Sequence, residues 1–164
     1  MVSKAKSIAL YGLEGILIEV EADVFKGEER FDIVGLPDTA VKESKERVHS
    51  AIKNTTGSFP YTTITVNLAP ADVKKEGAYL DLPIAVTILR AVNNKLIRDI
   101  SSTVFIGELS LEGRLRPVSG ILPIVLFAKK QGLKRIVLPS ENAKEASLVS
   151  GVEIITVGYL KEVI

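Results

Sequence analysis

Apolar and polar residues alternate along the first quarter of the chain. In the stretch 15–25, every second residue is apolar and the positions between are largely acidic: Ile16, Ile18, Val20, Ala22 and Val24 against Glu19, Glu21 and Asp23. A period of two predicts a half-buried strand. The stretch 7–12 shows the same alternation, and Gly12 and Gly15 between the two favour a hairpin. Residues 30–37, which end in Gly and Pro, predict a third strand.

A helical period follows these strands. Residues 37–54 predict a helix capped by Asp38 or Thr39. Its apolar face comprises Val41, Val48, Ala51 and Ile52, and Glu43 with Arg47 makes a favourable i,i+4 pair. The β-branched stretch 61–69 predicts a fourth strand. A second helix is expected from about Asp81 to Val92.

The second half of the chain changes to a strand–helix alternation. Residues 103–120 predict two strands joined by a tight turn at Glu112 and Gly113. A helix is predicted over 120–132, with Gly132 at C′. A strand over 133–139 and a helix over 140–151, capped by Ser140 or Asn142, follow it. The last elements are a strand over 152–158 and the start of a helix over 159–164. Such an alternation predicts parallel crossover units. The expected fold class is therefore α/β (α+β): a mixed sheet with packed helices.

Composition narrows the possible functions. The 164 residues fit one domain, with 46% hydrophobic and 25% charged residues. A net charge of +1 gives no overall attraction to nucleic acid or to an anionic membrane. The absence of Cys excludes disulfides and thiolate zinc sites, and a single histidine, His49, leaves no imidazole cluster for a metal. No signal peptide or membrane-spanning run is visible, so we expect a cytoplasmic protein.

Motifs for catalysis and for phosphate binding are also missing. No glycine-rich turn is followed by Lys and Ser/Thr, as a P-loop requires. His49 lies in the middle of a charged helix, which is typical of a surface histidine rather than of a catalytic triad. The acidic side chains are spaced as on a solvated strand face or lie in the charged loop at Glu28 and Glu29. We therefore expect no catalytic, cofactor or metal site in this chain.

Three long stretches nevertheless resemble one family. They are Phe31–Ile52, Ile64–Val86 and Phe105–Pro123, with a weaker fourth at Val137–Ala146. They are similar to the N-terminal domain of magnesium-chelatase-like AAA+ proteins of the ComM type, known as competence proteins. The resemblance covers nearly the whole chain from Ser7 onward.

This resemblance implies a ribosomal-protein-S5 domain-2 fold in its Lon-protease-like branch. It also implies that the domain belongs to a longer protein: a hexameric, ATP-driven motor that acts on DNA in branch migration during transformation. ATP and Mg would then bind a P-loop AAA+ module outside these residues. That module, the neighbouring subunits and DNA are the partners that the resemblance suggests, and no membrane partner is expected.

Lon-type peptidases carry a serine at the start of a helix and a lysine one hairpin later. When the stretches around Gly77 and Gly120 are aligned with that family, the serine position falls on or next to Asp81 and the lysine position on Pro123. A carboxylate without an activating partner does not form an acyl intermediate, and proline has no nitrogen that acts as base. The resemblance therefore implies a peptidase-like scaffold without the Ser–Lys dyad.

Two polar residues at element ends have a structural and a functional interpretation. Asp81 is expected to cap its helix, supported by Pro83 in the first turn. The functional alternative is an acid that meets a basic group on a neighbouring domain or subunit. Asn67 is expected to close the turn after its strand rather than to contact a ligand.

Basic residues supply the remaining candidates for a binding surface. The candidates for DNA or partner contacts are Lys42, Lys45, Arg47, Lys74, Lys75, Arg114 and Arg116, together with Asp81. If they converge they would form a phosphate-tracking patch, whereas the interleaved acids Glu43, Glu46 and Glu76 favour ordinary solvated surfaces. The leading hypothesis is a non-catalytic domain of a DNA-acting AAA+ motor. The alternatives are a stand-alone nucleic-acid-binding module and a Lon-like serine peptidase with an unrecognised nucleophile.

Overall fold

The computed structural model describes residues 1–97, 100 and 102–164. Its strands are β1 (Val2–Tyr11), β2 (Glu14–Phe25), β3 (Arg30–Val34), β4 (Thr63–Ala69), β5 (Thr103–Phe105), β6 (Glu108–Leu109), β7 (Leu115–Arg116), β8 (Arg135–Pro139) and β9 (Glu153–Val157). Its helices are α1 (Thr39–Thr56), α2 (Asp81–Val92), α3 (Ile121–Lys130) and α4 (Ala143–Ala146), with the 3₁₀ turns η1 (Ala78–Leu80), η2 (Ser140–Asn142) and η3 (Leu160–Glu162).

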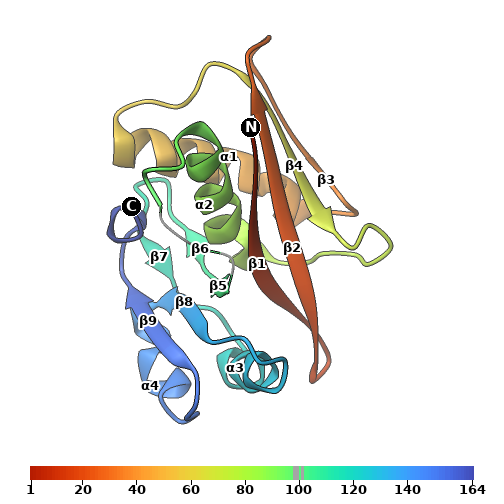
Figure 1. Cartoon of the computed structure of the whole chain (residues 1–164), viewed down its shortest axis with the longest axis vertical. Helices are drawn as coiled ribbons and strands as arrows, with labels where there is room; N and C mark the ends of the chain where they lie inside the picture. The colour runs from red at the N-terminus through yellow and green to blue at the C-terminus, as the bar shows by residue number, and fades with distance from the viewer. Residues whose placement is uncertain (98–99, 101) are drawn as a thin grey trace.

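Seven strands form one mixed sheet in the order β3-β4-β2-β1-β5-β8-β9, and β6 pairs with β7 separately. The hairpin of β1 and β2 is antiparallel, as is the pairing of β2 with β4. The remaining pairs in the large sheet are parallel. These pairings confirm the predicted α/β class, the hairpin and the parallel strands of the second half (Figure 1).

Helices cover the two faces of this sheet unequally. On β1, Ala5 and Ala9 belong to the core under α1 and α2, whereas Ile8 belongs to a second core under α3 and α4. Neighbouring strand residues point to opposite faces, so α2 and α3 pack on opposite sides of the sheet. Tyr79, just before α2, is the residue that packs against both cores.

The first helix follows its predicted pattern closely. Asp38 is the N-cap, with its carboxylate accepting the Val41 N–H at 2.8 Å. The four predicted apolar residues of α1 are all buried, and Gly57 ends the helix in the left-handed conformation. A cap and an apolar stripe are local signals, which is why the sequence predicts this element well.

Three predicted elements of the second half differ from the structure. Residues 103–120 contain three short strands rather than two, because Thr103–Phe105 joins the large sheet while β6 and β7 form the hairpin. The helix predicted over 140–151 is only a 3₁₀ turn followed by α4, and neither Ser140 nor Asn142 caps it through its side chain. Asn142 instead exchanges two hydrogen bonds of 2.9 Å with the backbone of Val118. The predicted last helix is the 3₁₀ turn η3.

The expectation for Asn67 is also wrong. β4 continues through Ala69, so Asn67 lies inside the strand, and its amide donates to Glu21 Oε1 of β2 at 3.2 Å. The residue makes a cross-strand contact and closes no turn.

Candidate functional site

Asp81, the residue at the start of α2, is completely buried. Its Oδ1 accepts the Ser44 hydroxyl at 2.5 Å, and its Oδ2 accepts Arg47 Nε at 2.6 Å and the Leu109 N–H at 3.1 Å. A second guanidinium nitrogen of Arg47 reaches Oδ1 at 3.2 Å. The carboxylate thus ties α2 to α1 and to β6.

The predicted cap role for Asp81 is therefore wrong. No side chain caps α2, and the carboxylate points to α1 instead of to the first turn of its own helix. Its basic partner within this chain is Arg47, and a contact with a neighbouring domain or subunit stays a prediction. Helix α1 makes this possible because Ser44 and Arg47 are three residues apart and share one face.

The chemistry available to this carboxylate is limited by its contacts. Burial raises the pKa of Asp81 above its usual value, while the hydrogen bonds from Arg47, Ser44 and Leu109 act in the opposite direction. Both oxygens already accept hydrogen bonds, and the side chain has no exposed surface. A general base must reach its substrate's proton, and the Asp81 carboxylate has no exposed surface for such a contact in this structure.

The two positions compared with the Lon dyad lie in different helices. Asp81 is the buried first residue of α2, whereas Pro123 is half-buried in the first turn of α3. Pro123 lines a groove with the tip of the β1–β2 hairpin. Ser44 is the hydroxyl that contacts Asp81, and its Oγ donates to that buried carboxylate.

Lys75 is not part of an exposed basic loop. Its side chain is fully buried, and Nζ donates to the carbonyl oxygen of Gly35 at 2.7 Å and to that of Pro70. Burial lowers the pKa of Lys75, and Asp72 acts in the opposite direction. The prediction of a surface contact for Lys75 is therefore wrong, because the buried ammonium donates its hydrogen bonds to the loops at Gly35 and Pro70.

The backbone around Lys75 explains why the ammonium lies there. Gly35 has φ +105°, and a Cβ at this position would approach the carbonyl oxygen of Leu68 to 2.1 Å. Leu36 follows with φ +55°, in the left-handed region that costs a non-glycine residue about 1 kcal/mol or more. The Lys75 N–H donates to Leu36 O at 3.0 Å and Lys75 O accepts the Asp38 N–H at 2.9 Å. Main chain and side chain of Lys75 together hold this turn in place.

The other candidate basic residues divide into two groups. Arg114 pairs with Glu141 at 2.9 Å, Arg116 approaches Glu108 to 4.0 Å, and Arg47 is held by Asp81. The exposed or half-buried lysines Lys42, Lys45 and Lys74 have no ion-pair partner among the described residues.

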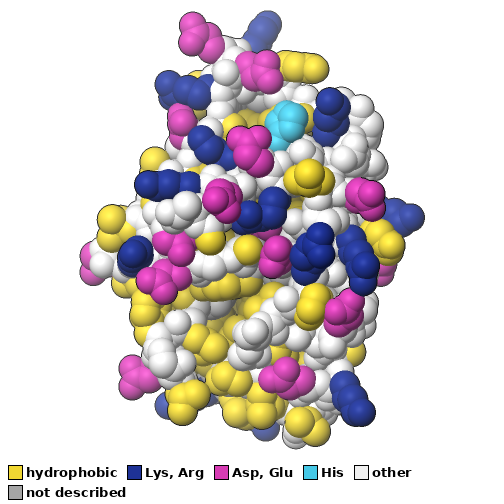
Figure 2. Space-filling view, turned by 180° about the vertical axis from the view of Figure 1, so that it is seen from behind, with side chains coloured by type: hydrophobic (Ala, Val, Ile, Leu, Met, Phe, Trp, Pro, Cys, Tyr) yellow, Lys and Arg dark blue, Asp and Glu magenta, His cyan; other side chains and the backbone are white. Residues whose placement is uncertain are grey.

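The loop that carries Lys74 and the helix that carries Lys42 and Lys45 are joined by a hydrogen bond at the start of α1. The loop that carries Lys74 packs on the start of α1, where the Gly77 N–H donates to Asp38 Oδ2 at 3.3 Å. Figure 2 shows the face that carries His49 (cyan), and there basic and acidic side chains are interleaved. That face therefore carries no continuous basic patch.

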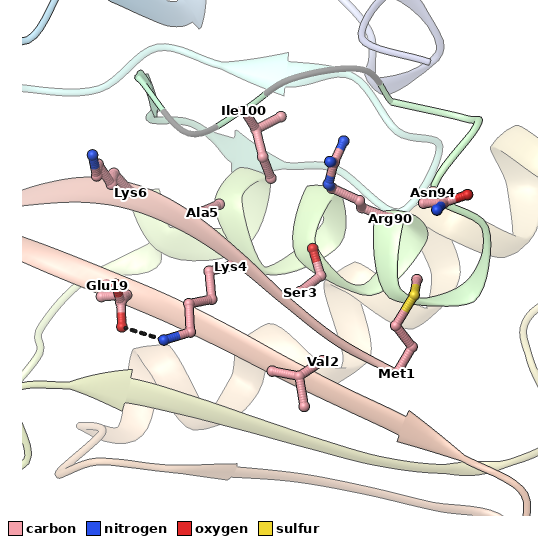
Figure 3. Close-up of a pocket in the computed structure, with 10 residues that line it drawn as sticks. All are labelled: Met1, Val2, Ser3, Lys4, Ala5, Lys6, Glu19, Arg90, Asn94 and Ile100. Carbon is pink, nitrogen blue, oxygen red and sulfur yellow. Dashed lines mark hydrogen bonds and ion pairs between the residues drawn. The ribbon is translucent and has the colours of Figure 1, made fainter.

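The N-terminal half of β1 borders a cavity of about 480 Å³ whose lining includes Lys4 and Arg90. Figure 3 shows these cationic side chains diverging: Lys4 turns to Glu19, whereas Arg90 rises from α2 on the other side of β1. The cavity therefore gathers no set of groups around one ligand. In the described part of the chain there is also no cluster of acids and histidine able to hold a metal, and no helix long and apolar enough to cross a membrane.

Comparison with known proteins identifies the family. Residues 20–142 match the family model of subunit ChlI of Mg-chelatase. The chain belongs to this ChlI family. A protein of Mycobacterium tuberculosis without an assigned function is 42% identical over 92% of this chain and 30% of its own length. The competence protein ComM of Haemophilus influenzae is 42% identical over 88% of this chain and 28% of its own length.

A more distant relative supports the likeness to Lon. The Lon protease of Methanosphaera stadtmanae is 28% identical over 80% of this chain and 16% of its own length. The predicted ComM-type and Lon-like resemblance is thus confirmed for this member of the ChlI family. The chain spans about 30% of the length of its more similar relatives.

Ser44 contacts Asp81 together with Arg47, but it is not among the predicted site residues. It lies three residues after Val41 and four before Val48, on the apolar face of α1. A hydroxyl within a buried stripe needs a partner, and this is the signal in the sequence that could have found it. Lys75 carries no comparable signal, because its burial depends on loops 40 residues and 5 residues away.

Proposed function

We propose that this chain is a non-catalytic domain of a ChlI-type AAA+ protein, and that it supports ring assembly or substrate engagement in a motor acting on DNA. In this proposal the ATPase activity, with its ATP and Mg, belongs to other parts of the full-length protein. The similar protein of Haemophilus influenzae is a competence protein, and this supports a role in competence for the full-length protein. Family membership supports oligomeric assembly.

The proposal that this domain is non-catalytic rests on the surroundings of Asp81. The start of α2, where the related peptidases place their nucleophile, is here a buried acid held by Ser44 and Arg47. A helix start used in this way has no free nucleophile and no adjacent base. The scaffold is thereby proposed to have been kept for its shape and its surfaces.

Serine-reactive phosphonate labelling separates this proposal from a peptidase. We expect no labelling of the folded chain and no hydrolysis of fluorogenic peptides. Labelling that a single Ser→Ala variant abolishes, with Ser119→Ala and Ser44→Ala tested first, would overturn the non-catalytic assignment. Ser119 is exposed, so its variant is not expected to disturb folding.

Substrate engagement is tested by fluorescence anisotropy with single-stranded and branched DNA over a salt series. If this domain binds phosphates, its affinity for DNA falls steeply as the salt concentration rises. The triple variant Lys42→Ala/Lys45→Ala/Lys74→Ala then reduces the slope of log K against log salt concentration by about 0.7–0.9 for each phosphate that is no longer neutralised. The matched control is Arg114→Ala/Arg116→Ala, whose charges are already paired. If the domain does not bind DNA at high micromolar protein, its role is restricted to assembly. If both variants bind DNA with the same salt dependence, the three lysines are not the residues that contact the phosphates.

A further inference from the structure

An apolar groove of about 650 Å³ lies between α3 and the tip of the β1–β2 hairpin. Its lining consists of Leu13, Glu14 and Gly15 from the hairpin and Leu122, Pro123, Leu126, Phe127 and Lys130 from α3. Figure 1 shows the hairpin tip beside α3 at the lower end of the molecule. The residues from α3 recur at helical spacing, so one stripe of the helix forms one wall.

The groove depends on a close approach of hairpin and helix. A Cβ at Gly15 would lie 2.3 Å from Cγ of Phe127, so only a glycine lets the Phe127 ring pack against the hairpin. Beside this contact, Leu13 is 86% exposed and Leu126 is 50% exposed. The groove therefore exposes a large hydrophobic side chain on each of its two walls, and an apolar groove rimmed by polar residues is a candidate for an interaction site.

The rims of the groove carry opposite charges. Glu14 lies on the hairpin side and Lys130 at the C-terminal end of α3, and both are exposed. Neither residue has an ion-pair partner among the described residues. Two copies of such a groove can face each other across a two-fold axis. The acid on one wall of each copy then meets the base on the opposite wall of the other copy, so the surface is complementary to itself.

We propose that this groove is a self-association surface, and that its occupant is a second copy of this chain. In the two-fold pair, Leu13 of each copy enters the groove of the other, and Glu14 of each copy faces Lys130 of the other. The proposal needs only this chain and is independent of any role in DNA binding. Eight residues line the groove, against about 20–30 a side in a standard interface, so the pair is weak, with a Kd in the micromolar range or above.

The first test is analytical ultracentrifugation of the full chain at low ionic strength. We expect the wild-type protein to show a concentration-dependent monomer–dimer equilibrium. Leu126→Glu places an unpaired charge in the groove and should weaken the dimer by about tenfold or more. The matched control is Leu148→Glu, because Leu148 is 75% exposed and lies outside the groove.

The second test uses the two rim charges. Glu14→Lys and Lys130→Glu each create two repulsive pairs in a two-fold dimer and should each weaken self-association. Mixing the two variants should restore association as a heterodimer, because both cross-copy pairs are then opposite in charge. Neither substitution touches a buried residue, so both variants are expected to fold; thermal unfolding followed by circular dichroism checks this.

The outcomes separate clearly. A wild-type chain that stays monomeric up to about 1 mM, the weak end of specific association, overturns the proposal. So does an equal effect of Leu126→Glu and Leu148→Glu, which would place the contact elsewhere. If the single charge reversals weaken the dimer and their mixture does not restore it, the two-fold pairing of Glu14 with Lys130 is wrong.

Discussion

Arg47 Nε lies 2.6 Å from Oδ2 of Asp81, and the two residues come from different helices and stand 34 positions apart. The acid is fully buried and the arginine side chain is 19% exposed. A pair so poorly hydrated gains from its short contacts only while both members are present, since Asp81 would lose its one ion-pair partner among the described residues and Arg47 would keep only the exposed Glu43. The contact therefore makes α1 and α2 depend on each other.

Removal of one member of this pair should destabilise the protein strongly. We expect Asp81→Ala to lower the free energy of unfolding by about 3 kcal/mol, because the largely buried Arg47 then keeps only the exposed Glu43 as a counter-ion. Urea unfolding of the single variants and of Arg47→Ala/Asp81→Ala gives the coupling energy, and the double variant should lose clearly less than the sum of the singles.

The matched control for this cycle is Glu43→Ala. Glu43 approaches Arg47 to 3.7 Å but is 64% exposed, so its loss should change stability by no more than about 0.5 kcal/mol. Additive single effects, or a Glu43 variant as damaging as the Asp81 variant, would show that the buried pair is not the contact that stabilises the helices.

Lys75 and its neighbour Lys74 offer a matched comparison of the same residue type. Lys75→Met keeps the aliphatic stem but leaves the carbonyl oxygens of Gly35 and Pro70 without their donor. Such unsatisfied groups cost about 1–3 kcal/mol, and we expect a loss of about 2 kcal/mol in urea unfolding. Lys74→Met changes an exposed side chain and should be nearly neutral. Equal effects of the two variants would contradict the assignment.

The cost of Lys75→Met should also depend on pH. Burial lowers the pKa of Lys75 below its usual value of 10.5. Between that lowered pKa and 10.5 the unfolded chain binds more protons at this residue than the native chain does, so the stability of the wild type rises with pH relative to the variant. Unfolding measured for both proteins between about pH 7 and pH 10 should show a growing difference. A constant or shrinking difference would be inconsistent with the burial of the ammonium.

The sequence predicts those parts of the fold that depend on local signals. The cap at Asp38 or Thr39 and the apolar face from Val41 to Ile52 follow from neighbours within a few positions of each other; the structure confirms the face and selects Asp38 as the cap. The predicted length of the helix after Pro139 is wrong. Asn142 contacts Val118, 24 positions away, instead of capping its own turn.

The candidate site is harder to predict for the same physical reason. Asp81 stands at a helix start, which favours a cap, but Ser44 and Arg47 approach it only once α1 packs on α2. Lys75 stands in a polar loop, which is typical of an exposed residue, but its ammonium fills the space between two loops brought together by the pairing of β3 with β4. Formal charge in a sequence therefore overstates the charge available to a partner at Arg47, Lys75, and the ion-paired Arg114.

The packing of Gly15 against Phe127 gives a last prediction that tests the groove wall itself. Gly15→Ala should lower the free energy of unfolding by about 1–3 kcal/mol, because the new methyl group would lie 2.3 Å from Cγ of the ring and force a shift. Phe127→Leu removes the ring and should cost stability on its own, yet it should reduce the penalty of Gly15→Ala in the double variant. Thermal unfolding of the four proteins measures this. If the alanine costs as much in the leucine background as in the wild type, the penalty arises from the hairpin backbone and not from contact with α3.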